Sequence, residues 1–189
     1  MKKVAVVYHS GFGHTQMQAK HVYKGADSVE GVEAALFKAE DVTGDPESLN
    51  DFDAIIFGAP TYMGSVSAPF KTFMDATSGL WFKQAWKDKL AAGFSNSGSP
   101  SGDKFNSLVQ LVTFAAQHSM IWVSLGLMNE SMKDNVPTGD PKAVNRLGSF
   151  LGATAQSDNV PPEQAPPAGD LKTAELLGIR VALATLRWD

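Results

Sequence analysis

Cysteine is absent from the 189 residues of the chain. Disulfides, thiolate nucleophiles and cysteine-ligated iron-sulfur clusters are therefore excluded, and any redox chemistry must come from a bound organic cofactor. Charge is also scarce, because 19% of the residues are charged and the formal net charge is -4. This mild acidity argues against a nucleic-acid partner and against an anionic membrane surface.

Long apolar runs are missing as well. The longest, around residues 120–128, is interrupted by Ser124 and Gly126 and falls well short of the roughly 18 residues that a membrane span needs. The opening stretch MKKVAVVYH has a charged start, but its apolar part ends after five residues, too few for a secretory signal. We therefore expect no membrane partner and a cytoplasmic location.

The segments that are present alternate between two kinds. Short apolar runs rich in β-branched residues predict five strands, at residues 4–8, 32–37, 54–57, 91–94 and 121–125. Longer amphipathic segments predict helices at residues 14–24, 68–76, 103–117 and 170–186, the last with Asp170 as its N-cap. This alternation indicates an α/β protein with a parallel sheet covered on both faces. The length suits one domain, residues 1–189, in which a proline-rich connector at 159–169 leads to the final helix.

The loop after the first predicted strand, residues 10–15, consists of glycines and hydroxyls with no lysine. Amides and hydroxyls at a helix N-terminus can hold a phosphate without a cation, because the helix dipole supplies about half a positive charge. A nucleoside-triphosphate loop would end in Gly-Lys-Ser/Thr, and a dinucleotide fingerprint would have glycine in place of Gln16. The loop fits a terminal phosphate monoester; the alternative is an ordinary strand-to-helix turn.

Two further loops follow the third and fourth predicted strands. Residues 58–65, GAPTYMGS, place amides beside an aromatic ring and a thioether, and such a loop can clasp a flat heteroaromatic ring. Residues 95–103, SNSGSPSGD, are rich in hydrogen-bond donors. Ligands of such sheets bind outside the carboxyl ends of the strands, so we expect the three loops to form one site.

Five stretches carry a family resemblance that runs over nearly the whole chain: residues 8–15, 53–81, 89–102, 117–120 and 151–155. The second of them is long and specific. Together they resemble the flavodoxin-like FMN family, and within it the NAD(P)H:quinone oxidoreductases named after the tryptophan-repressor-binding protein. The resemblance implies a doubly wound, five-stranded parallel sheet of order 2-1-3-4-5. It also implies an FMN cofactor, with NADH or NADPH as co-substrate.

The resemblance further implies which residues form the site. The implied cofactor-binding residues are Ser10, Phe12, Gly13, His14, Thr15, Pro60, Thr61, Tyr62, Met63, Gly64, Asn96, Ser97, Gly98, Ser99 and Gln117. Phe12 and Trp81 would contact the substrate, Trp81 near a subunit contact of a homodimer or homotetramer. The segment SGLWFKQAW around Trp81 suits an exposed oligomer or substrate surface, although core packing is an alternative.

Several residues depart from the family pattern. Tyr62 and Met63 stand where the family has arginine and phenylalanine, and residues 99–101 are poorer in glycine than usual. Gln117 takes the place of the histidine expected at the flavin. A donor to the quinone oxygen could be His118, Tyr62 or a solvent proton; His118 is the candidate catalytic residue, with a helix-end cap as its alternative role.

The main functional hypothesis is therefore a flavoenzyme that passes a hydride from NAD(P)H through FMN to a quinone or similar two-electron acceptor, in a ping-pong cycle. The alternative is a flavodoxin-type one-electron carrier, to which twenty acids against sixteen bases are a weak match. A protein that has kept the fold and lost the flavin is disfavoured by the intact first loop. The isolated carboxylates Asp75, Asp103, Glu130 and Asp134 give a metal or hydrolase site no support.

Overall fold

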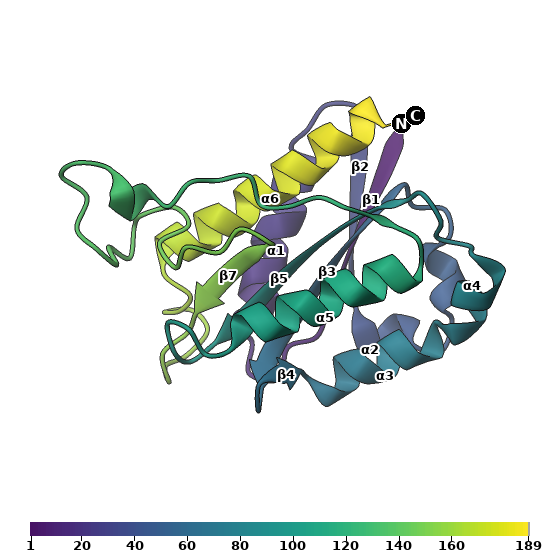
Figure 1. Cartoon of the computed structure of the whole chain (residues 1–189), viewed down its shortest axis with the longest axis horizontal. Helices are drawn as coiled ribbons and strands as arrows, with labels where there is room; N and C mark the ends of the chain where they lie inside the picture. The colour runs from purple at the N-terminus through teal and green to yellow at the C-terminus, as the bar shows by residue number, and fades with distance from the viewer. Residues whose placement is uncertain (189) are drawn as a thin grey trace.

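A parallel sheet between two layers of helices organises the computed structural model, which describes residues 1–188 (Figure 1). Its main path is β2-β1-β3-β5-β6. Because β5 and β6 are the fourth and fifth predicted strands, the predicted order 2-1-3-4-5 is confirmed. Neighbours on this path are parallel, and two short strands lie off it. The strands are β1 (Lys2–Tyr8), β2 (Val32–Lys38), β3 (Ala54–Tyr62), β4 (Ser65–Val66), β5 (Leu90–Ser97), β6 (Ile121–Trp122) and β7 (Ala153–Gln156).

The helices form two layers, each with its own apolar core. On one face lie α1 (His14–Asp27) and α6 (Ala168–Arg187). The other face is covered by α2 (Ala39–Val42), α3 (Ala68–Ala76), α4 (Ser78–Lys83) and α5 (Lys104–Gln117). Short 3-10 turns, η1 (Pro46–Leu49) and η2 (Glu130–Met132), lie in connections. Within residues 1–188, no helix combines the length and apolar character that crossing a membrane requires.

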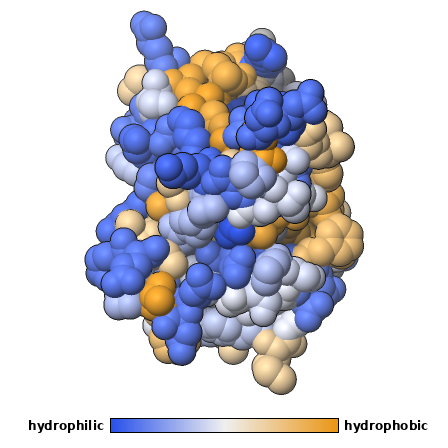
Figure 2. All heavy atoms as spheres, turned by 90° about the vertical axis from the view of Figure 1, so that its left-hand side faces the viewer, coloured by the Kyte–Doolittle hydropathy of each residue, from blue (hydrophilic) through white to orange (hydrophobic). Residues whose placement is uncertain are grey.

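The predicted fifth strand, residues 121–125, is wrong in its extent. Only Ile121 and Trp122 pair with β5. The Trp122 ring packs over Gly93, and a Cβ added to Gly93 would lie 2.8 Å from that ring. The chain leaves the sheet, protrudes at the left of Figure 1 on a largely hydrophilic side of the molecule (Figure 2), and returns as β7. Because β7 pairs with the second half of β5, two segments share the edge that one was expected to fill.

The predicted N-cap of the last helix is also wrong. The helix begins at Ala168, and Asp170 lies inside its first turn with 1% of its surface exposed. The Asp170 carboxylate accepts two hydrogen bonds from Arg146, at 2.8 and 2.9 Å, and one from the Gln156 backbone. Burial raises the pKa of Asp170, whereas these hydrogen bonds oppose the rise. Asp170 therefore joins α6 to the loops around β7 and does not cap a free helix end.

The helices α1 and α6 cross at two glycines. A Cβ at Gly178 would overlap the Val22 carbonyl oxygen, and a Cβ at Gly25 would overlap the Glu175 carbonyl oxygen. The helix backbones can approach so closely only because these side chains are missing. This contact fixes α1, whose first turn follows the residue 10–13 loop.

We expect Gly178→Ala to lower the free energy of unfolding by about 2 kcal/mol, because overpacking at a backbone contact outweighs the better helix propensity of alanine. Chemical denaturation measures this change. Gly79→Ala in α4 is the matched control, since a Cβ there meets nothing within 4 Å. An unchanged stability of Gly178→Ala would contradict the close approach.

His118 lies in the aromatic core beneath α5. It is 2% exposed, and its ring centroid lies 4.6 Å from that of Trp86. The Thr77 hydroxyl donates to the Met74 carbonyl, so the 2.9 Å contact between Thr77 and His118 Nε2 requires Nε2 to carry the proton. Nδ1 is buried with no partner among the described residues. Burial without a compensating charge lowers the pKa of His118 to about 4.

This lowered pKa predicts a stability change with pH. In the unfolded chain the pKa of His118 is about 6.5, whereas in the folded protein it is about 4. The contribution of His118 to the free energy of unfolding is therefore complete above pH 6.5. As the pH falls toward 4, this free energy decreases by up to about 3 kcal/mol. Unfolding measured at both pH values should show a smaller loss in His118→Phe than in the wild type, and identical losses would rule out a neutral, buried His118.

Candidate functional site

The carboxyl ends of β1, β3 and β5 border a cavity of about 770 Å³. Its walls come from the three loops that the sequence singled out and from a fourth segment near the C-terminus. The lining residues are Ser10, Phe12, His14, Thr15, Pro60, Thr61, Tyr62, Asn96, Ser97, Gly98, Ser99 and residues 157–162. A cavity of this size, with mixed apolar and polar walls, is typical of a cofactor site.

The first loop turns sharply into α1. Gly13 has a left-handed backbone (φ 90°), and its amide donates to the Ser10 hydroxyl at 3.1 Å. The first turn of α1 holds no acidic residue, so the positive end of the helix dipole is not offset there. No lysine or arginine lines the cavity within the described residues. An anion at this corner would therefore be held by amides, hydroxyls and the helix dipole.

The second loop is anchored from below by a chain of buried hydroxyls. Ser95 donates to the Ala59 carbonyl, so the 2.8 Å contact between Thr61 and Ser95 must use the Thr61 proton. The 2.7 Å contact between Thr61 and Ser107 must in turn use the Ser107 proton. The Thr61 hydroxyl is thus engaged inside the protein, and these bonds tie β3 and β5 to α5.

Aromatic rings join the first and second loops. The Phe12 and Tyr62 rings meet edge to face, with centroids 6.3 Å apart. Burial raises the pKa of Tyr62, although a hydrogen bond from the Gly11 backbone opposes the rise. The phenol keeps its proton at neutral pH and remains a donor. Met63 and Gly64 form the exposed turn between β3 and β4, both with positive φ, and do not line the cavity.

The fourth wall, residues 157–162, was missed by the sequence reasoning. The His14 Nε2 proton is donated to the Val160 carbonyl at 2.7 Å, and the Ser157 hydroxyl donates to Asn96 at 2.9 Å. Pro162 lies so close to Gly13 that a Cβ added to Gly13 would be 2.9 Å from the Pro162 ring. The pair Pro161-Pro162 was the available signal, because prolines stiffen a segment that could serve as a wall.

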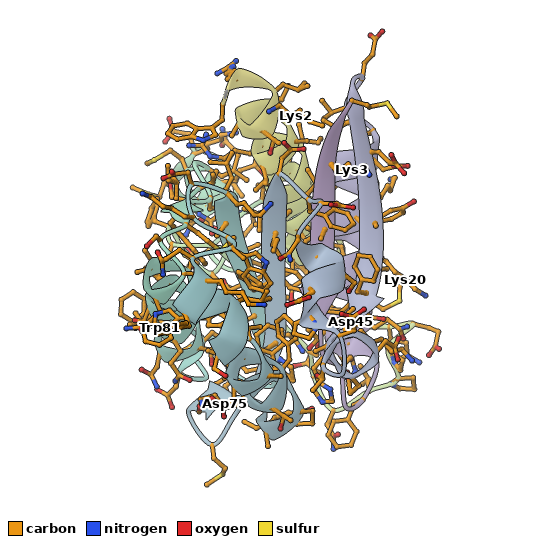
Figure 3. All side chains as sticks on the ribbon, turned by 90° about the vertical axis from the view of Figure 1, so that its right-hand side faces the viewer. Lys2, Lys3, Lys20, Asp45, Asp75 and Trp81 are labelled. Carbon is orange, nitrogen blue, oxygen red and sulfur yellow. The ribbon has the colours of Figure 1, made fainter. Side chains whose placement is uncertain are left out.

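Besides Met63 and Gly64, three predicted site residues lie away from this cavity. Gln117 and His118 are at the far end of α5, where the Ser119 carbonyl accepts from Asp88 beside the start of β5. This is the opposite edge of the sheet, because α5 begins beside the cavity and runs back along the strands. Trp81 on α4 is 44% exposed and points outward from the sheet in Figure 3.

Within residues 1–188, no three His, Asp or Glu side chains are grouped so that they could hold a metal ion.

Comparisons with known proteins agree with this geometry. A family model described as NADPH-dependent FMN reductase matches residues 15–131. Flavodoxin FldP of Pseudomonas aeruginosa (strain UCBPP-PA14) is 44% identical over an alignment of 186 residues that covers 96% of this chain and 96% of its own. Quinone-oxidoreductase QR2 of Triphysaria versicolor is 33% identical over 176 residues, covering 80% of this chain and 82% of its own.

A solved structure supports the same assignment. The flavodoxin, WrbA-like protein from Agrobacterium tumefaciens superposes over the whole of both chains with a TM-score of 0.76 and 38% sequence identity. The resemblance to the tryptophan-repressor-binding (WrbA) type is thereby confirmed. The chain belongs to the NADPH-dependent FMN reductase family of flavodoxin-like proteins.

Proposed function

We propose that the cavity binds FMN and that the protein transfers a hydride from NAD(P)H through this flavin to a quinone or similar two-electron acceptor. One observation carries the proposal: a lysine-free phosphate-type loop and an aromatic, donor-rich wall border the same cavity of about 770 Å³. Family membership supports the cofactor, and the quinone-oxidoreductase relative supports the class of acceptor.

The residues present fit the two ends of FMN. The phosphate would lie at the start of α1, on the backbone of Phe12 to Thr15 and the hydroxyls of Ser10 and Thr15. A third anchor at that end is the dipole of α1, a helix of 14 residues. The flat ring would lie between the second and third loops, beside Tyr62 and the amides of residues 96–99.

When bound, FMN would supply the ring that accepts the hydride and releases electrons. The chain's own residues bind and orient it. The buried hydroxyls below Thr61 hold the second loop in one geometry, so the ring contacts need no rearrangement. The Tyr62 phenol, protonated at neutral pH, can donate a hydrogen bond to an acceptor oxygen as negative charge develops there.

We also propose that the protein acts as a homodimer or homotetramer. Trp81 and Phe82 on α4 are 44% and 83% exposed, an unusual surface for two large aromatic side chains. Neither residue lines the cavity of its own chain. A role of Trp81 at the substrate therefore requires a neighbouring copy.

A one-electron carrier is the second candidate. It is favoured by the relative at 44% identity, which bears the name flavodoxin. Both candidates require FMN in the same cavity. They differ in whether NAD(P)H reduces the flavin without a partner reductase.

Anaerobic addition of NADH or NADPH to the FMN-loaded protein should bleach the yellow colour of the flavin, and a quinone should restore it. Stopped-flow absorbance with each nicotinamide separates the two candidates. Colour that persists until a partner reductase is added would identify a carrier and contradict the proposed enzyme.

Gly13→Val should raise the FMN dissociation constant by at least about tenfold, because valine is strained at φ 90° and its side chain would meet Pro162. Flavin fluorescence titration measures this change. Gly44→Val is the matched control, since a Cβ there meets nothing within 4 Å. Normal flavin affinity in Gly13→Val would show that the phosphate lies elsewhere.

A further inference from the structure

Lys104, the first residue of α5, buries its ammonium group beneath the third loop. The side chain is among the largest that are fully buried, with 2% of the residue exposed. Nζ donates to the Ser97 hydroxyl at 2.7 Å, to the Ser99 carbonyl at 2.7 Å and to the Pro100 carbonyl at 3.1 Å. All three donor positions of the ammonium are therefore used on this one loop.

The backbone before Lys104 turns so as to place it there. Gly102 and Asp103 both have left-handed conformations, with φ of 51° and 52°. A Cβ at Gly102 would overlap the Ser97 hydroxyl, so the turn passes directly beneath the loop. A left-handed aspartate costs energy, and the position of Lys104 depends on it.

The buried charge of Lys104 has no direct ion pair among the described residues. Two charged groups act on it: Asp170 on α6, which favours the ammonium, and Arg146 from the segment before β7, which disfavours it. Burial outweighs both and lowers the pKa of Lys104 to about 8. A buried ammonium costs several kcal/mol unless its contacts compensate, and these contacts all lie on the loop that lines the cavity.

The three bonds also decide what the loop presents to a ligand. Lys104 does not line the 770 Å³ cavity, whereas Ser97 and Ser99 do. The carbonyls of Ser99 and Pro100 are thus turned toward Lys104 and away from the cavity. Freed carbonyls could rotate toward it and repel the carbonyl oxygens of a flavin ring.

We propose that Lys104 is a positioning residue for FMN, holding the third loop with its acceptors turned away from the cofactor. The proposal rests on the proposed function, because it assumes that FMN occupies this cavity. Lys104 acts through the loop and touches neither the flavin nor the substrate.

The test is FMN titration of the apoprotein for the wild type, Lys104→Met and Lys89→Met. Lys89 is the matched control: it is partly buried, its pKa is also lowered by burial, and it donates to the Asn50 and Phe52 carbonyls at the other edge of the sheet. We expect Lys104→Met, which removes all three bonds to the loop, to raise the FMN dissociation constant about tenfold, and Lys89→Met to leave it unchanged. Thermal unfolding of both apoproteins separates lost stability from lost binding.

A pH profile of the wild type tests the same role without any substitution. Deprotonation of the Lys104 ammonium removes one of its three donors, so FMN binding should weaken between about pH 7 and about pH 9.5, whereas Lys104→Met should show no such change. The proposal is overturned if Lys104→Met binds like the wild type, if Lys89→Met weakens binding equally, or if the wild-type profile is flat. Wild-type protein that fails to bind FMN at all would instead overturn the proposed function.

Discussion

Among residues 1–188, no lysine or arginine lines the cavity, so an anion at the first loop would be held by backbone and hydroxyl dipoles alone. Dipoles act only at short range and in one direction, whereas a lysine side chain can follow a displaced ligand. The start of α1 must therefore stay where it is. The left-handed Gly13, its bond to Ser10 and the contact with Pro162 fix that start from three sides.

The rest of the fold supplies this rigidity. On one face, α6 presses against α1 at Gly25 and Gly178, so the helix that carries the first loop cannot slide. On the other face, the chain Ser107–Thr61–Ser95 ties α5 to β3 and β5 below the second loop. Both cores thus hold loops at the same edge of the sheet. A preformed site of this kind binds without the cost of ordering its walls.

Much of this arrangement could be predicted from the sequence. The runs at 4–8, 54–57 and 91–94 are apolar on both faces, and only a central parallel strand buries both. The family was identified from the motifs, and the sheet order was what that resemblance implied. The edge near β6 and β7 could not be predicted, because strands of two and four residues have little periodicity of their own.

The site was predictable to the extent that its residues lie at the carboxyl end of a strand or just beyond it. Ser10, Thr61 and Asn96 do, and they line one cavity. His118 was proposed from a motif, but its position depends on the direction and length of α5, which carry it to the opposite edge. Asp170 looked like a free helix cap because its partner Arg146 is distant in sequence. Contacts of this kind depend on the tertiary structure and leave no local pattern.

The order in which these parts are synthesised has a consequence. Three walls of the cavity come from the first 99 residues, but the fourth comes from residues 157–162. During translation this last wall is added only after β7, the strand that pairs with β5, has been synthesised. Chains that end before residue 157 therefore lack a closed cavity, however completely the first three walls have formed.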